Sequence, residues 1–125
     1  MPSPRPAARA ADIDRTLAAL GEPTRRQVVD LLRVRAHRAG ELAEALGTSA
    51  PAMSRHLRVL RQSGLTEEED LAEDGRVRII RLRRERFTEL SAWLAGVDAF
   101  WSDQLGAFKA HAERTRGRKA RRGAA

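Results

Sequence analysis

Apolar residues recur three or four residues apart through the first third of the chain, a spacing typical of amphipathic helices. Gly21 separates two such runs, and Pro23 stands where the first turn of a helix needs no N–H donor. We therefore expect one helix before residue 21 and a second that begins at Pro23 and ends near residues 37–40. The apolar faces of these helices consist of Ile13, Leu17, Leu20, Val28, Leu31 and Leu32.

Residues 39–64 predict a helix-turn-helix. The segment AGELAEALG has leucines at i and i+4, and a tight turn at GTS follows it. Ser49 is a suitable N-cap for the next helix, Pro51 fits its first turn, and Gly64 ends it. A short helix, a tight turn and a second helix with outward polar side chains are typical of this motif. The inner face of the second helix is formed by Met53, Leu57 and Leu60.

Placing that inner face in the core turns Arg55 and Arg58 outward. An arginine can donate two hydrogen bonds to guanine or phosphate, so these two are the best candidates for DNA contacts, although a solvated helix face is the alternative. We interpret His56 as a partly packed residue and not a general base, because Ser54 does not face it and no carboxylate on that face orients it. The candidate contacts on this helix are Ser49, Ala50, Ser54, Arg55, His56, Arg58 and Gln62.

The stretch GLTEEEDLAEDGRVRIIRLRR (residues 64–84) predicts a β-hairpin, or wing, directly after the helix-turn-helix. Its Asp-Gly pair, residues 74–75, is typical of a two-residue hairpin turn, and Arg76 and Arg78 beyond the turn join the candidate DNA contacts. The adjacent Ile79 and Ile80 require either a bulge or a strand buried on both faces.

A two-residue turn would place Glu68 opposite Arg81 and Leu71 opposite Arg78. A longer loop at the tip is the alternative, because the acidic strand has no alternating apolar residues to fix the register. The acids at residues 67–70 point alternately to two faces, so they cannot converge on one metal ion. We expect them to pair with the arginines across the hairpin. We also expect them to repel DNA phosphate when the wing is misplaced on the duplex, which would weaken non-specific DNA binding.

A long final helix is expected to begin at residues 84–86, and its apolar stripe is too long for a small winged domain to cover. An exposed stripe of this size usually contacts another chain. We therefore expect a homodimer joined through the first and last helices, with packing inside one monomer as the alternative. The predicted interface consists of Ile13, Leu17, Leu20, Leu90, Trp93, Leu94, Val97, Phe100, Trp101, Leu105 and Phe108.

The net charge of +7 over 125 residues is concentrated at the two ends of the chain. Residues 1–10 and 114–122 hold eight of the 24 basic groups, which leaves 16 against all 17 acidic groups between them. We expect residues 1–10 to be a disordered arm, residues 11–113 a winged helix-turn-helix domain with a long dimerisation helix, and residues 114–125 a basic flexible tail. The fold class is thus mainly α with a small β-hairpin.

Composition excludes several kinds of protein. The absence of cysteine removes disulfides and thiolate metal sites, and no apolar run approaches the length of about 18 residues that a membrane span needs. The first ten residues lack the apolar region of a secretory signal, so we expect a cytoplasmic protein. No pair of titratable groups has the spacing of a catalytic site, and we expect neither an enzyme nor a bound cofactor.

Three segments carry a resemblance to a known family: ALGEPTRRQVVDLL, ELAEALGTSAPAMSRHLRVLRQSGL and DGRVRIIRL. They resemble the ArsR/SmtB-type winged-helix transcriptional regulators, and FTELSAWLAGVDAFWSDQLGAFKAH is similar to a cysteine-free branch of that family. The resemblance implies a homodimeric repressor that binds a palindromic operator and is released by an effector, here one not held by thiols, such as a small molecule. It also implies that the wing is about three residues longer than is common.

The metal sites of the family are not matched here. The thiolate sensors need cysteines in the third helix, and this chain has none. A second group binds metal along the last helix, and the nearest match places Asp98 and His111 at two of the four ligand positions but Phe100 and Arg114 at the others. Two ligands beside an arginine will not hold a divalent ion, so we expect no metal. An architectural or RNA-binding protein that uses the basic tail, and a protein-interaction module that binds no DNA, remain alternatives.

Overall fold

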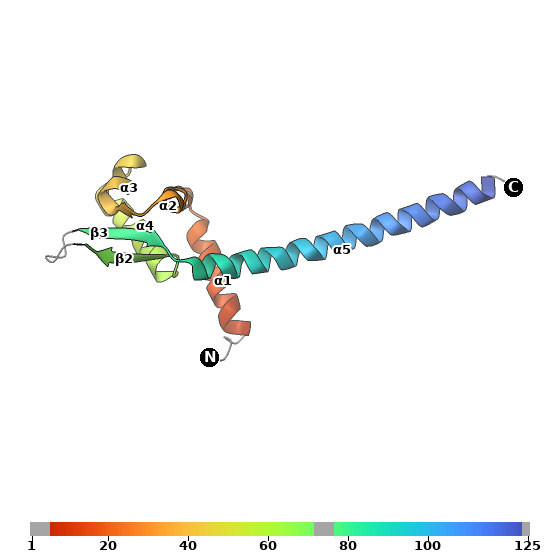
Figure 1. The fold of residues 1–125 in the computed structure, drawn as a ribbon, viewed down its shortest axis with the longest axis horizontal. Helices are drawn as coiled ribbons and strands as arrows, with labels where there is room; N and C mark the ends of the chain where they lie inside the picture. The colour runs from red at the N-terminus through yellow and green to blue at the C-terminus, as the bar shows by residue number, and fades with distance from the viewer. Residues whose placement is uncertain (1–5, 72–76, 124–125) are drawn as a thin grey trace. The chain divides into compact units, whose positions relative to one another are not determined.

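The computed structural model describes the backbone of residues 6–71 and 77–123 and the side chains of residues 8–71 and 77–117. The chain divides into two units, Met1–Leu90 and Ser91–Ala125. Figure 1 shows the elements in chain order. The helices are α1 (Pro6–Leu20), α2 (Pro23–Val34), α3 (Ala39–Ala45), α4 (Ala50–Gln62) and α5 (Arg84–Gly123).

The expected helix-turn-helix is formed by α3 and α4. Pro23 stands in the first turn of α2, and the Ser49 hydroxyl caps α4 by accepting a hydrogen bond from the Ala52 amide at 3.2 Å. The helical state also covers residues 6–10, for which we expected a disordered arm, and residues 114–123, for which we expected a flexible tail. Three of residues 6–10 are alanine, the best helix former, and six of residues 114–123 are arginine or lysine, which are also good helix formers.

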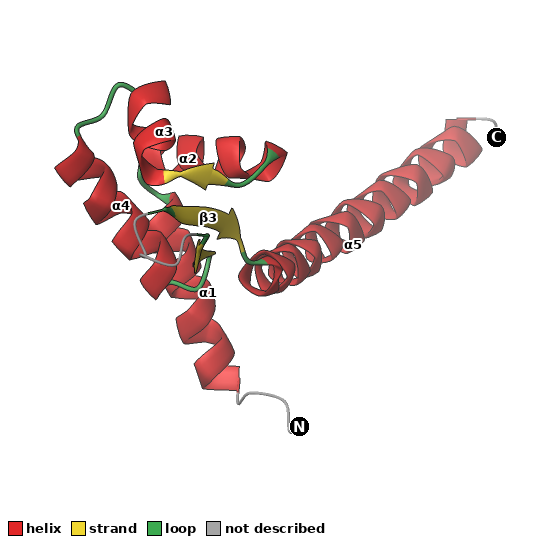
Figure 2. Cartoon of the chain, turned by 60° about the vertical axis from the view of Figure 1, so that its left-hand side comes forward, coloured by secondary structure: helices red, strands yellow, loops and turns green. Residues whose placement is uncertain are grey.

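Three short strands form one antiparallel sheet in the order β1 (His37–Arg38), β3 (Arg78–Leu82), β2 (Thr66–Asp70). Figure 2 shows the strands beside α2, α3 and α4. The strand β1 was not expected, because we extended the second helix to residues 37–40. The helix ends instead at Val34, and a two-residue strand is too short to produce an alternating pattern.

The register of the hairpin differs by one residue from the two-residue turn prediction. Glu68 lies opposite Ile80 and not Arg81, and the Leu71 amide donates to the Val77 carbonyl at 2.9 Å. Seven residues, 71–77, therefore lie between β2 and β3. The Asp-Gly pair and Arg76 are among residues 72–76, outside the described residues. When the pairing of the two strands shifts by one residue, each acid shares a face of the hairpin with a different arginine.

The pairing of residues 66–70 with residues 78–82 runs without a bulge. Ile80 is 1% exposed and lies in the core, whereas Ile79 points to the other face and is half-buried. The adjacent isoleucines thus reflect a central strand that is covered partly on both faces. The core that surrounds Ile80 consists of Ala19, Val28, Leu32, Leu42, Ala43, Met53, Leu57, Leu60 and Leu65.

Arg25, in the first turn of α2, contacts the end of α1 and the middle of α4. Its guanidinium Nε donates to the carbonyl of Ala19 at 2.6 Å, which satisfies a free carbonyl at the end of α1. Its Nη1 lies 3.4 Å from Nδ1 of His56 on α4. The Glu22 carboxylate caps α2 by accepting from the Arg25 amide at 2.9 Å and lies 3.8 Å from the same His56 nitrogen. The hydrogen bond from the Arg25 amide lowers the pKa of Glu22, and the positive charges of His56 and Arg25 add to that effect.

Gly64 ends α4 in a left-handed conformation with φ of 79°. The Gly64 amide donates to the Arg61 carbonyl at 3.0 Å and the Leu65 amide donates to the Leu60 carbonyl at 2.9 Å, the pair of bonds that closes a Schellman motif. A Cβ at this position would also lie 3.2 Å from the side chain of Arg86. Only glycine fits this turn without strain, and the turn sends the chain from α4 into β2.

We expect Gly64→Ala to lower the free energy of unfolding by about 1–2 kcal/mol, because alanine is strained in the left-handed region. Gly40→Ala is the matched control, since Gly40 lies in α3 with open space around its Cα. That change should be neutral or should stabilise by up to about 1 kcal/mol. Urea denaturation followed by circular dichroism measures both. Equal effects of the two substitutions would contradict the strained turn.

A carboxylate whose pKa is lowered in the folded protein stabilises it above the pKa of the unfolded chain and loses that contribution as the pH falls. We therefore expect Glu22→Gln to reduce the melting temperature at neutral pH, and the difference from wild type to shrink as the pH falls from neutral through the lowered pKa of Glu22, because protonation removes the charge that Gln also lacks. Thermal denaturation across this pH range measures the difference. A gap between the two proteins that stays constant down to acid pH would contradict the assignment.

Candidate nucleic-acid interface

The outer face of α4 is polar and exposed, as the sequence indicated. Met53, Leu57 and Leu60 are buried, which confirms the predicted inner face. Arg55 and Arg58 point away from the core, and among the ion pairs within the described part of the chain none involves either guanidinium. The exposed candidate contacts on α4 and at its cap are Ser49, Ala50, Ser54, Arg55, Arg58 and Gln62.

His56 is the one candidate on α4 that is half-buried, and its side chain is 21% exposed. We predicted a packed histidine with no carboxylate to orient it. The packing agrees, but the second half of that prediction is wrong, because the Glu22 carboxylate lies 3.8 Å from Nδ1. Glu22 precedes His56 by 34 positions, and only the folding of α2 against α4 brings the two together. The arrangement anchors α4, since Arg25 approaches the same nitrogen.

The wing contributes Arg78, which is exposed and shares a face of β3 with Ile80. Its Nη1 lies 3.6 Å from Oε2 of Glu68, and its Nε lies 3.4 Å from Oδ1 of Asp70. The other oxygen of Glu68 lies 3.3 Å from Nη1 of Arg61 on α4. The candidate contact Arg76 lies in the connection outside the described residues.

Arg61 and Glu68 are two polar residues at this surface that our candidate set did not contain. Arg61 stands seven residues after Ser54 and therefore lies on the same side of α4, which was a usable signal. Glu68 gave no such signal, because its position depends on the hairpin register. On the other face of the sheet, Arg81 pairs with Glu69 in the same way. The acidic run therefore does pair with arginines, Glu68 and Glu69 through partners that the two-residue turn did not predict.

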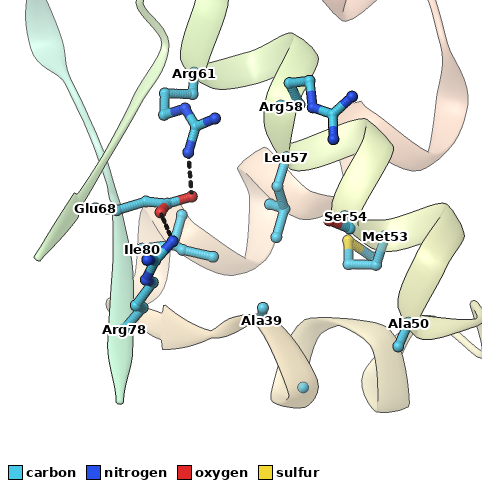
Figure 3. A pocket seen from close by; sticks show the side chains of 11 residues that line it. Ala39, Ala50, Met53, Ser54, Leu57, Arg58, Arg61, Glu68, Arg78 and Ile80 are labelled. Carbon is cyan, nitrogen blue, oxygen red and sulfur yellow. Dashed lines mark ion pairs between the residues drawn. The ribbon is translucent and has the colours of Figure 1, made fainter. Parts of the chain in front are cut away.

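A hollow of about 340 Å³ lies between α4, the sheet and the start of α3. Figure 3 shows Arg61 and Arg78 pointing toward the Glu68 carboxylate from opposite sides, with Arg58 on the other side of Leu57. The polar rim thus combines three guanidinium groups with one carboxylate. The lining residues are Ala39, Gly40, Ala50, Met53, Ser54, Leu57, Arg58, Arg61, Glu68, Arg78 and Ile80.

The apolar stripe of α5 is exposed in the single chain. Its exposed side chains range from Val97 at 38% to Phe108 at 72%, and the rings of Phe100 and Trp101 pack edge to face at 5.8 Å. The other exposed members of the predicted interface on α5 are Trp93, Leu94 and Leu105. In the first unit, Leu17 of α1 is 43% exposed, and Ile13, Leu20 and Leu90 are half-buried.

In residues 6–71 and 77–123, no group of three or more histidine, aspartate or glutamate side chains is placed to hold a metal ion. Over the same ranges, no helix combines the length and apolar character needed to cross a membrane.

The sequence profile described as "Bacterial regulatory protein, arsR family" matches residues 22–68, which include α2, α3 and α4. The HTH-type transcriptional regulator Rv2034 of Mycobacterium tuberculosis is 36% identical over 92 residues, which cover 74% of this chain and 80% of that protein. The transcriptional repressor SdpR of Bacillus subtilis is 42% identical over 45 residues, 36% of this chain. That second match spans only 50% of SdpR.

Solved structures give the same result. An ArsR-like transcriptional regulator from Rhodococcus sp. RHA1 superimposes with a TM-score of 0.67 at 28% identity, over 80% of this chain and 92% of that one. The homodimeric winged helix-turn-helix DNA-binding domain Mb0332 from Mycobacterium bovis, described as a possible ArsR-family regulator, gives a TM-score of 0.58 at 25% identity, over 83% of this chain and 91% of that one. The chain therefore belongs to the arsR family of bacterial regulatory proteins, and it is a DNA-binding transcriptional regulator with a winged helix-turn-helix fold and not an enzyme.

Proposed function

We propose that the protein is a homodimeric, sequence-specific transcriptional repressor that binds a palindromic operator. The observation that carries this proposal is the exposed polar face of α4, where Arg55 and Arg58 have no ion pair among the described residues. Two free guanidinium groups on one helix face can enter a major groove and donate paired hydrogen bonds to guanine. Its relative SdpR is named a transcriptional repressor, and this supports repression as the mode of regulation.

The other residues proposed to contact DNA have different roles. The Ser49 hydroxyl already accepts the Ala52 amide, so Ser49 and Ala50 place the positive end of α4 near a phosphate. Ser54 and Gln62 flank the arginines, and His56 fixes the helix to α2. The wing arginines Arg76 and Arg78 contact the phosphate backbone, and such contacts position the protein without reading sequence.

Dimerisation through α1 and α5 is supported by the exposed apolar stripe on α5. Side chains as large as Trp101 and Phe108 are more than half exposed in the single chain. Burying such side chains against a second copy stabilises the pair by about 1.5–3 kcal/mol for each residue that becomes fully covered. The homodimeric state of Mb0332 supports the same arrangement. We further propose that a small molecule, held without thiolate ligands, releases the protein from DNA.

We expect wild-type protein to protect a palindrome in its own promoter, with half-sites about one helical turn apart. The double substitution Arg55→Ala, Arg58→Ala should weaken binding to that site at least about tenfold, because each paired contact to guanine contributes about 1–3 kcal/mol. Footprinting and fluorescence anisotropy measure the two effects. The control is Arg33→Ala, an exposed arginine of α2 that should leave the affinity unchanged.

The same measurements separate the alternatives. If binding survives the double substitution but is lost on truncation after residue 113, the protein is an architectural or RNA-binding protein that uses its basic tail. If no salt-dependent DNA binding is found, the winged helix is a protein-interaction module.

We expect wild-type protein to be a dimer in sedimentation or light-scattering measurements and Trp101→Glu to shift it toward monomer, because a charge in an apolar interface is costly to bury. Ala99→Glu is the matched control, since it adds the same charge on the opposite side of α5. Circular dichroism checks that both variants stay helical. A monomeric wild type, or an equal response of the two variants, would contradict dimerisation through this stripe.

A further inference from the structure

Glu68 joins the helix-turn-helix to the wing by two ion pairs. One carboxylate oxygen lies 3.3 Å from Arg61 on α4, and the other lies 3.6 Å from Arg78 on β3. The Glu68 side chain is 19% exposed, whereas those of Arg61 and Arg78 are 49% and 61% exposed. A half-buried anion therefore lies between two cations that reach in from more open positions.

The charged groups of the hollow lie at its rim. Its floor is formed by Met53, Leu57 and Ile80, which are 1%, 5% and 1% exposed, so the accessible polar groups are the side chains of the rim. The rim is where a ligand gains free energy, because arginines bind phosphate oxygens through strong charge-assisted hydrogen bonds. In Figure 3 the two guanidinium groups converge on one place, and the Glu68 carboxylate occupies it.

We propose that Glu68 is an internal competitor of DNA phosphate: it holds Arg61 of α4 and Arg78 of the wing together, and a backbone phosphate must displace it to bind them. This inference rests on the proposed DNA-binding function and adds a positioning residue to it. While Glu68 is paired, the two arginines are partly neutralised and attract any DNA less strongly. Non-specific binding is almost wholly electrostatic, so this pairing lowers the affinity for DNA of any sequence.

The neighbouring Glu69 provides a matched comparison. It pairs with Arg81 on the other face of the same two strands, away from α4. Glu68→Gln and Glu69→Gln each remove one negative charge from adjacent positions of β2, so general repulsion of DNA changes equally in both. Only Glu68→Gln removes ion pairs of the arginines that face the hollow: Arg61 loses its pair with Glu68, and Arg78 keeps only its pair with Asp70.

The experiment measures the affinity of the full-length protein for a duplex of random sequence by fluorescence anisotropy at several salt concentrations. We expect Glu68→Gln to bind roughly three- to tenfold more tightly than wild type, and Glu69→Gln to differ from wild type by less than about twofold. In an Arg61→Gln, Arg78→Gln background, Glu68→Gln should give no gain, because the residues through which it acts are absent. The melting temperature of each variant confirms that it is folded.

Two results would overturn the inference alone. Equal gains in DNA affinity from Glu68→Gln and Glu69→Gln would show that both acids act by general charge repulsion. Weaker DNA binding by Glu68→Gln would show that Glu68 instead stabilises the position of the wing. A gain that persists without Arg61 and Arg78 would overturn it as well. Absence of salt-dependent binding by wild-type protein would overturn the proposed function together with the inference, so the two failures are distinguishable.

Discussion

The burial of Met53, Leu57 and Leu60 in the same core as Ile80 is the constraint on which the functional surface depends. A helix that must present these three side chains to the core has no freedom left in its rotation about its own axis. Arg55 and Arg58 are therefore exposed as a consequence of packing. The N-cap at Ser49 and the left-handed turn at Gly64 fix where this helix begins and ends.

The electrostatics of the wing follow from a second constraint, the register of β2 and β3. With Glu68 opposite Ile80, its side chain lies on the face toward α4 and Glu69 lies on the other face. Two adjacent acids of the same charge thereby acquire different partners. A difference of one residue in pairing would exchange their environments, although the composition of the hairpin would be unchanged.

The elements that the sequence predicted well are those that a local pattern determines. Helical spacing, the Ser49 cap and the Gly64 stop were sufficient for α4 and its two faces. The strand β1 has only two residues, so it carries no pattern, and the hairpin register lacked the apolar alternation that would have set it. The approach of Glu22 to His56 depends on how α2 packs on α4, which no spacing along the chain encodes.

Only Arg83 separates the last residue of β3, Leu82, from the first residue of α5, Arg84. The Arg83 amide donates to the carbonyl of Leu65, the residue before β2, at 2.9 Å, so a hydrogen bond holds even this single linking residue. A connection this short leaves the backbone between β3 and α5 little conformational freedom. The first turn of α5 therefore cannot shift relative to β3 unless the backbone of Arg83 changes its conformation or its hydrogen bond to Leu65 breaks.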